Sequence, residues 1–152
     1  MKRTLSQADV TSQPHLVWNA FVDLLAMEDF DDLSAVQRPA HLVFWYDSEV
    51  QNGGHLQYFL NPAGGHVAEA IEALTELRLP QQAAILSRAV ARWREKPRTQ
   101  PADTEEYSAE ALSEEFADCD ADFHACSPTV LAALERYLAS HMDDFISFTP
   151  AA

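Results

Sequence analysis

The residues with the richest chemistry lie between positions 45 and 65, where all four glycines of the chain also occur. Glu49 and His55 stand on either side of an Asn-Gly-Gly turn, and Gln57 and Tyr58 follow. A carboxylate beside an imidazole can act in acid–base catalysis or hold a metal ion. The segment lacks a serine elbow, a phosphate-binding glycine loop and a nucleophile–base pair. An enzyme or small-ligand-binding domain that uses this corner is therefore kept as an alternative hypothesis.

A second candidate is the run Asp118-x-Asp120-x-Asp122, which has the opening spacing of a calcium-binding loop. Such a loop needs glycine at its sixth position and glutamate at its twelfth, where this chain has Phe123 and Thr129. The nearby thiols and imidazoles lack the paired spacing of a zinc site. The sequence predicts no catalytic residue, no metal site and no cofactor.

The charge of the chain favours an interaction instead. Asp and Glu number 24 against 10 Lys and Arg, which gives a formal net charge of -14 and an isoelectric point near 4.6. Phosphate contacts need clustered Lys and Arg, so we expect no direct binding of nucleic acid. The acidic residues concentrate in two stretches, 4–37 and 99–135, that contain no Lys or Arg.

Carboxylates held on rigid helices can imitate the phosphates of DNA, which carries about one negative charge per 1.7 Å of helix axis. They would then occupy the basic groove of a DNA-binding protein, with fast and salt-sensitive association. The alternative is that the acidic runs only keep a surface hydrated. The residues predicted to contact the partner are Glu28, Asp29, Asp31, Asp32, Asp103, Glu105, Glu106, Glu110, Glu114, Glu115, Asp118, Asp120 and Asp122.

Helices must position these side chains, because apolar residues recur at helical spacing and no segment shows clean strand alternation. The spacing predicts an all-α, single-domain compact bundle of about six to eight helices, after a loose arm at 1–11. The segment 42–46 is apolar on every side, which is typical of a central buried helix. The expected helices cover about 14–27, 34–51, 55–60, 66–79, 83–93, 112–123 and 128–145. The apolar stripe of the helix at 112–123 consists of Leu112, Phe116, Cys119 and Phe123. Ser127 is the expected N-cap of the last helix.

The glycine corner separates the central helix from the short helix at 55–60. Asn52-Gly53 is expected to end the central helix in a left-handed cap, and Gly64-Gly65 to break the chain again. A helix corner inside a core leaves polar groups without partners. Glu49, Asn52, Gln57 and Tyr58 are therefore interpreted as side chains that satisfy such groups, so the corner is mainly structural.

Length and composition bound the rest. The 152 residues are enough for one domain, 1–152, with one core. No apolar run reaches the ~18 residues of a membrane span, so we expect no membrane association. Met1-Lys2-Arg3 is followed by polar residues instead of the apolar part of a signal peptide, so we expect a cytoplasmic protein. Cys119 and Cys126 should then be reduced thiols.

The corner also carries a long family motif. The sequence resembles the bacterial family of small acidic DNA-mimic proteins, long catalogued as a domain of unknown function, and departs from its pattern at His55, where an aromatic residue is expected. The resemblance implies an all-helical, often dimeric domain whose acidic surface replaces DNA on a protein such as a transcriptional regulator. The motif residues are Glu49, Asn52, Gly53, Gly54, Gln57, Tyr58, Phe59, Asn61 and Gly64.

The leading hypothesis is thus a non-catalytic, homodimeric acidic protein that mimics DNA and binds the basic surface of a DNA-binding protein. An antitoxin or immunity-type protein would be equally acidic and would bind a toxic enzyme instead. That alternative stays open.

Overall fold

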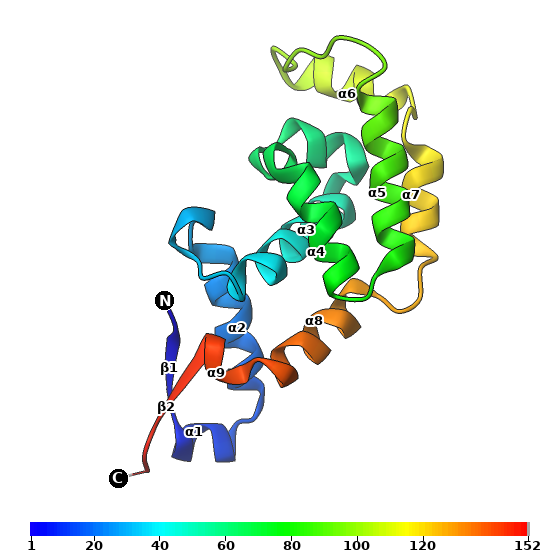
Figure 1. Cartoon of the computed structure of the whole chain (residues 1–152). Coiled ribbons are helices and arrows are strands. Elements are labelled where there is room, and N and C mark those ends of the chain that lie inside the picture. Colours follow the sequence, from blue (N-terminus) through cyan, green and yellow to red (C-terminus); the bar gives the residue numbers. More distant parts are fainter. Residues whose placement is uncertain (152) are drawn as a thin grey trace.

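The computed structural model describes residues 1–151, and Ala152 of the expected domain lies outside the described residues. Helices make up most of it and pack into one elongated body, which confirms the all-α prediction (Figure 1). In chain order the elements are β1 (Arg3–Ser6), α1 (Gln7–Ser12), α2 (His15–Met27), the 3-10 turn η1 (Phe30–Asp32), α3 (Gln37–Leu60), the 3-10 turn η2 (Pro62–His66), α4 (Val67–Glu76), α5 (Pro80–Trp93), α6 (Thr104–Leu112), α7 (Ala117–His124), α8 (Val130–Ser140), α9 (Met142–Phe145) and β2 (Ile146–Thr149).

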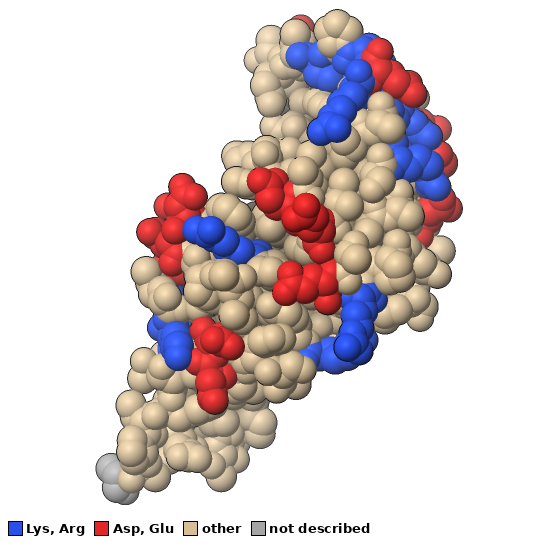
Figure 2. Space-filling view, in the orientation of Figure 1, with Lys and Arg blue, Asp and Glu red and all other residues tan. Residues whose placement is uncertain are grey.

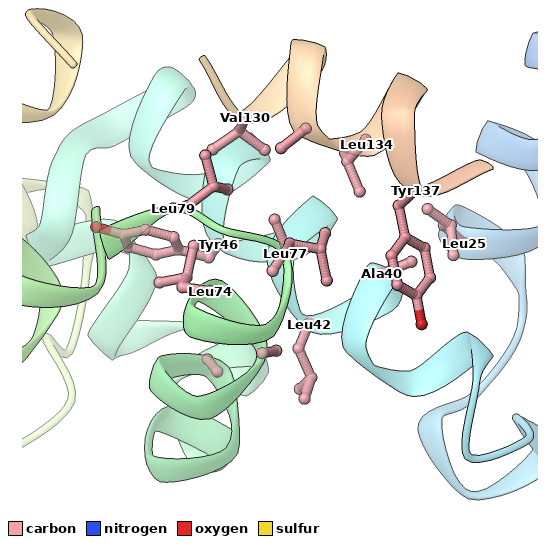
Figure 3. Packing of buried hydrophobic residues seen from close by; sticks show 14 of the residues in the cluster. Leu25, Ala40, Leu42, Tyr46, Leu74, Leu77, Leu79, Val130, Leu134 and Tyr137 are labelled. Carbon is pink, nitrogen blue, oxygen red and sulfur yellow. The ribbon is translucent and has the colours of Figure 1, made fainter. Parts of the chain in front are cut away.

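Helix α3 is the centre of the fold, as its apolar sequence predicts. It packs against α2, α4, α7 and α8. Figure 3 shows Leu42 and Tyr46 of α3 among apolar side chains of the α4–α5 hairpin and of α8. Full burial of one such side chain contributes about 1.5–3 kcal/mol to folding. The many neighbours of α3 therefore fix its position firmly.

The hairpin of α4 and α5 forms as the sequence predicts. Leu77 and Leu79 are buried at its turn, and Arg78 between them adopts a left-handed φ of 61°. Pro80 begins α5, where its missing N–H costs nothing and its fixed φ suits a helix. The hairpin covers one side of α3 and places the outer face of α4 in solvent.

The prediction of a loose arm at 1–11 is wrong. Residues 3–6 form β1, which pairs in parallel with β2, and residues 7–12 form α1. The side chain of Gln37 donates hydrogen bonds to the carbonyl oxygens of Met1 and Asp144, at 2.5 and 2.9 Å. These partners are distant in sequence, and a four-residue strand is too short to show alternation. The strand pairing holds the two ends of the described chain together, and the hydrogen bonds of Gln37 attach both ends to α3.

Two other helix boundaries differ from prediction. The helix expected over 112–123 begins only at Ala117 as α7, after a turn in which Glu114 has a left-handed φ of 54°, and the preceding helix α6 was not predicted. The side chain of Leu112 in its predicted stripe lies outside the described part of the structure. The terminal helix begins two residues late, because Thr129 instead of Ser127 caps it, accepting a hydrogen bond from the N–H of Ala132 at 3.2 Å. That helix also breaks at His141, between α8 and α9.

Within residues 1–151, no helix is both long enough and apolar enough to cross a membrane.

Candidate functional site

The first candidate site is the glycine corner, which is a kink inside α3. Gly53 and Gly54 have non-helical dihedral angles, and Gly54 has a φ of 73°. The left-handed residue is thus Gly54 instead of the expected Gly53. A Cβ on Gly54 would collide with the carboxylate of Asp120, and one on Gly53 with the side chain of Gln57. Both glycines are needed because other side chains already fill the space beside them.

His55 follows the kink and joins it to α7. It is 0% exposed. Its Nδ1 lies 2.6 Å from Oδ1 of Asp120, and its backbone N–H donates to the same oxygen at 2.9 Å. Its Nε2 lies 2.8 Å from the hydroxyl of Tyr46, which is also fully buried. All polar atoms of this imidazole have partners within the protein, so His55 builds a buried chain of hydrogen bonds from Tyr46 to Asp120.

The titration of Asp120 reflects these contacts. Burial by itself would raise the pKa of this carboxyl group, but the hydrogen bonds from the side chain and backbone of His55 outweigh it and leave the pKa below its ordinary value. Burial also raises the pKa of Tyr46 well above its ordinary value. The ionised carboxylate of Asp120 is therefore part of the architecture of the corner.

Glu49 spans the kink from the other side. Its Oε2 accepts hydrogen bonds from the amide groups of Gln57 at 2.7 Å and Asn61 at 2.6 Å. Glu49 precedes the kink and the two amides follow it, so these bonds hold the two halves of α3 at a fixed angle. The partners of Glu49 are thus side chains, whereas backbone groups were expected.

The remaining motif residues pack the corner against its neighbours. Tyr58 is buried, its ring lies edge-on against Tyr46 at 5.1 Å, and burial raises its pKa well above the ordinary value. Phe59 stacks on Trp93 of α5 at 4.9 Å. A Cβ on Gly64 would lie 2.7 Å from the carbonyl oxygen of Tyr58, so glycine lets η2 approach α3 closely. Asn52 of the motif is exposed.

The second candidate site is the set of predicted carboxylates, and much of its acidic run on α7 is paired internally. Arg92 of α5 forms two hydrogen bonds with Asp118, and Arg88 pairs with Asp122. The bond from Arg92 lowers the pKa of Asp118 well below its ordinary value. These pairs are exposed, so each contributes about 0–1 kcal/mol. Their main effect is to neutralise the charge of this flank.

Four further predicted residues also have internal partners. Arg98 binds Glu115 through two bonds and lowers its pKa, and Arg3 pairs with Glu28. Asp103 caps α6 by accepting from the N–H of Glu106 at 2.9 Å. The carboxylate of Glu106 in turn accepts from the N–H of Ala102 at 2.6 Å. These groups stabilise local structure.

Six predicted carboxylates have no hydrogen bond or ion pair with the described residues. Three lie at or beside η1 and three lie on α6 or just after it; α6 is at one end of the molecule, whereas the turn after α2 that contains η1 lies part-way along it (Figure 1). Arg38 donates to backbone oxygens in η1, at 3.2 Å for Phe30, and so fixes that turn without neutralising its side chains. The six are Asp29, Asp31, Asp32, Glu105, Glu110 and Glu114.

Sequence analysis missed an acidic row on α4. Glu69, Glu72 and Glu76 are exposed and make no side-chain hydrogen bond or ion pair with the described residues. Figure 2 shows acidic side chains over α4 and over η1 on one face of the molecule. The signal that could have revealed the row is its i, i+3, i+7 spacing opposite the buried Ala70 and Leu74.

Among the described residues, no group of three or more His, Cys, Asp and Glu side chains could hold a metal ion. Cys119 and Cys126 are free thiols in residues 1–151.

The fold and the surface define an all-helical protein with an acidic face held by a kinked central helix. Residues 31–141 match the family model described as DMP19-like protein, and the chain belongs to this family. The matched range contains α3 to α8, Asp31 and Asp32 of η1 and the carboxylates on and just after α6, whereas Asp29 lies before it. Neither a curated protein nor a solved structure matches the chain.

Proposed function

We propose that this protein mimics DNA and binds the basic surface of a DNA-binding protein, such as a transcriptional regulator. The observation that carries the proposal is the face on which η1 and α4 present carboxylates without internal partners (Figure 2). Membership of the DMP19-like family supports it. The unpaired carboxylates on α6 are a second contact region at the far end of the same body.

The geometry of α4 suits the charge pattern of DNA. Residues at i, i+3 and i+7 are about 4.5 and 6 Å apart along a helix axis. One strand of DNA presents a phosphate about every 3.4 Å. The spacing of the two arrays is therefore of the same order, and a Lys- or Arg-lined groove that receives phosphates can also receive Glu69, Glu72 and Glu76.

The internal ion pairs indicate which part of the acidic surface is available to bind the partner. On the flank of α5 and α7, arginines already neutralise Glu115, Asp118 and Asp122. A basic groove would gain little binding energy from this flank, because the arginines of this chain would repel the positive charges of the groove. The proposal thus gives η1 and α4 the leading part and α7 a structural one.

The test is capture of partners from a cell lysate at low salt, with competition by duplex DNA. We expect DNA-binding proteins to be captured, and to be released both by high salt and by added duplex. Capture of no DNA-binding protein at low salt would overturn the proposal. Capture of an enzyme that duplex DNA fails to displace would instead support the antitoxin or immunity-type function.

The acidic face is tested by a triple variant, Glu69→Gln with Glu72→Gln and Glu76→Gln, which should lose most of the capture. The matched control removes three charges outside η1, α4 and α6: Asp9→Asn with Glu135→Gln and Asp143→Asn, all exposed residues. Equal loss in both variants would mean that net charge alone governs binding.

We further propose that the protein acts as a homodimer in the cytoplasm. The family resemblance supports the dimer, and the free Cys119 and Cys126 suit a reducing compartment. Sedimentation equilibrium of the purified chain tests the dimer, which a single species at the monomer mass would contradict.

A further inference from the structure

One cavity borders the acidic group of η1 and includes Asp29 in its lining, but most of its wall comes from other side chains. It has a volume of about 370 Å³ and lies where the end of α2 and η1 face α3 and η2. Sites for small organic ligands begin near ~300 Å³, so the cavity is of that size. Its lining includes Phe30, His41, Trp45, Glu49, Ala63 and His66.

The walls of the cavity are largely aromatic. The rings of Phe30 and His66 lie 4.4 Å apart, and that of His41 lies 6.1 Å from Phe30 and 6.4 Å from Trp45. The indole N–H of Trp45 donates to the carbonyl oxygen of Leu25 at 3.1 Å. This bond uses the only donor of the indole and fixes the ring. Fixed aromatic faces attract cations through their electron-rich π surfaces.

Glu49 supplies a rigid negative charge to the same cavity. Gln57 and Asn61 hold its Oε2, while no described residue donates a hydrogen bond to its Oε1. Glu28 and Asp29 also line the cavity, and no Lys or Arg among the described residues does. A cation that enters therefore meets a carboxylate whose orientation is already fixed, so little conformational entropy is lost on binding.

His41 adds a polar atom without opposing charge. Its Nδ1 is buried and has no hydrogen-bond partner among the described residues. Burial lowers the pKa of His41, and the neighbouring His66 lowers it further, so the ring is neutral at neutral pH. A neutral imidazole in the wall does not repel a cation.

The family motif builds this cavity. The amides of Gln57 and Asn61 orient Glu49, and the close approach at Gly64 brings η2 against α3. That approach places Ala63 and His66 in the wall. The corner that joins the helices is thus also the frame of a binding site.

We propose that the cavity binds an organic cation, an ammonium or guanidinium group on a short apolar stem, between Glu49 and Trp45. Free alkylamines and alkylguanidines share this chemistry with the lysine and arginine side chains of proteins. The inference does not depend on DNA mimicry, because it concerns different side chains from the row on α4.

The first test is calorimetric titration of the full chain with butylguanidinium and with butylurea, its neutral analogue of similar shape. We expect saturable binding of the cation, at least about tenfold tighter than that of the urea, because one charged hydrogen bond is worth that much. Equal affinities, or no saturable binding in the millimolar range, would overturn the proposal.

Variants locate the site. Glu49→Gln keeps the shape of the side chain and should weaken binding about tenfold. Ala63→Leu fills the cavity without removing a side-chain hydrogen bond, so it tests the site even if Glu49→Gln folds poorly. The matched control, Glu72→Gln, removes one charge from α4 and should bind as the unmodified chain does. Binding that survives both cavity variants would refute the assignment.

A comparison of two cations then identifies the source. Agmatine represents a free amine and guanidine, and acetyl-Ala-Arg-Ala-amide represents an arginine within a protein. Tighter binding of agmatine assigns a small molecule, and tighter binding of the peptide assigns a partner's side chain; either supports the cation site. Failure of both to bind would overturn it.

Discussion

Helices α7 and α4 each carry three acidic residues, but the fold uses them differently. On α7, Asp118 and Asp122 pair with arginines of α5, and Asp120 binds the buried His55. On α4, the three glutamates have no side-chain partner among the described residues. The charge of a segment in the sequence is therefore a poor guide to the charge that its surface offers. Carboxylates with partners stabilise the fold, whereas those without partners are available to bind.

The largest effect that this comparison predicts is on stability, from Asp120→Ala. The substitution leaves the backbone N–H and Nδ1 of the buried His55 without their acceptor. We expect a loss of about 2–4 kcal/mol in the free energy of unfolding, measured by urea denaturation. Asp122→Ala is the matched control on the same helix and should cost less than about 1 kcal/mol. A similar cost for both would mean that α7 is not tied to the corner through Asp120.

That tie also shows where sequence analysis stops. The α4–α5 hairpin was predictable, because a repeat of apolar residues and Pro80 encode it locally. The bond from His55 to Asp120 joins residues 65 positions apart, and it depends on the angle of a kink that the sequence does not specify. Pairing of β1 with β2 joins segments that are more distant still, as in the register of Arg3 with Ile146. Local patterns thus located the glycine corner, whereas the partners of its side chains required the structure.

The acidic sites show the same contrast between what a local pattern predicts and what depends on contacts between distant residues. Runs of Asp and Glu were easy to find, but ion pairs with α5 form only after α7 packs beside it. The cavity next to Glu49 was out of reach as well, because its walls come from four separate elements. Only the row on α4 could be predicted from a local pattern, the helical spacing of Glu69, Glu72 and Glu76.

A second prediction concerns acid. The folded pKa of Asp120 lies below its ordinary value of 3.8, so its contribution to stability is full above that pH and is lost as the pH falls through the folded pKa. The free energy of unfolding should therefore decrease from about pH 5 downward, and Asp120→Asn should flatten the decrease. Urea denaturation of both proteins at stepwise pH measures it. Identical slopes would show that this carboxylate does not stabilise the fold through its charge.

A smaller effect is expected from the exposed pairs of α5 and α7. A double-mutant cycle with Arg92→Ala and Asp118→Ala should give a coupling energy of about 0.5–1 kcal/mol. The value is small because both side chains are partly hydrated, although the pair has two hydrogen bonds. Moderate salt should reduce it further. A coupling above about 2 kcal/mol would place this flank among the main stabilising contacts, beside Asp120.

The smallest effect has the opposite sign and separates α4 most clearly from α7. Glu76 is the last residue of α4 and lies four residues after Glu72. Its negative charge is therefore repelled by the negative end of the helix dipole and by the carboxylate of Glu72. Glu76→Gln should therefore stabilise the protein by about 0.2–0.5 kcal/mol. Glu69→Gln, in the favourable first turn, should instead cost a similar amount. If urea denaturation finds that Glu76→Gln destabilises the chain, its carboxylate has a partner within the protein, and the contrast between α4 and α7 fails. If it finds stabilisation, Glu76 weakens the fold while it extends the acidic row, which is the behaviour expected of a residue that serves binding.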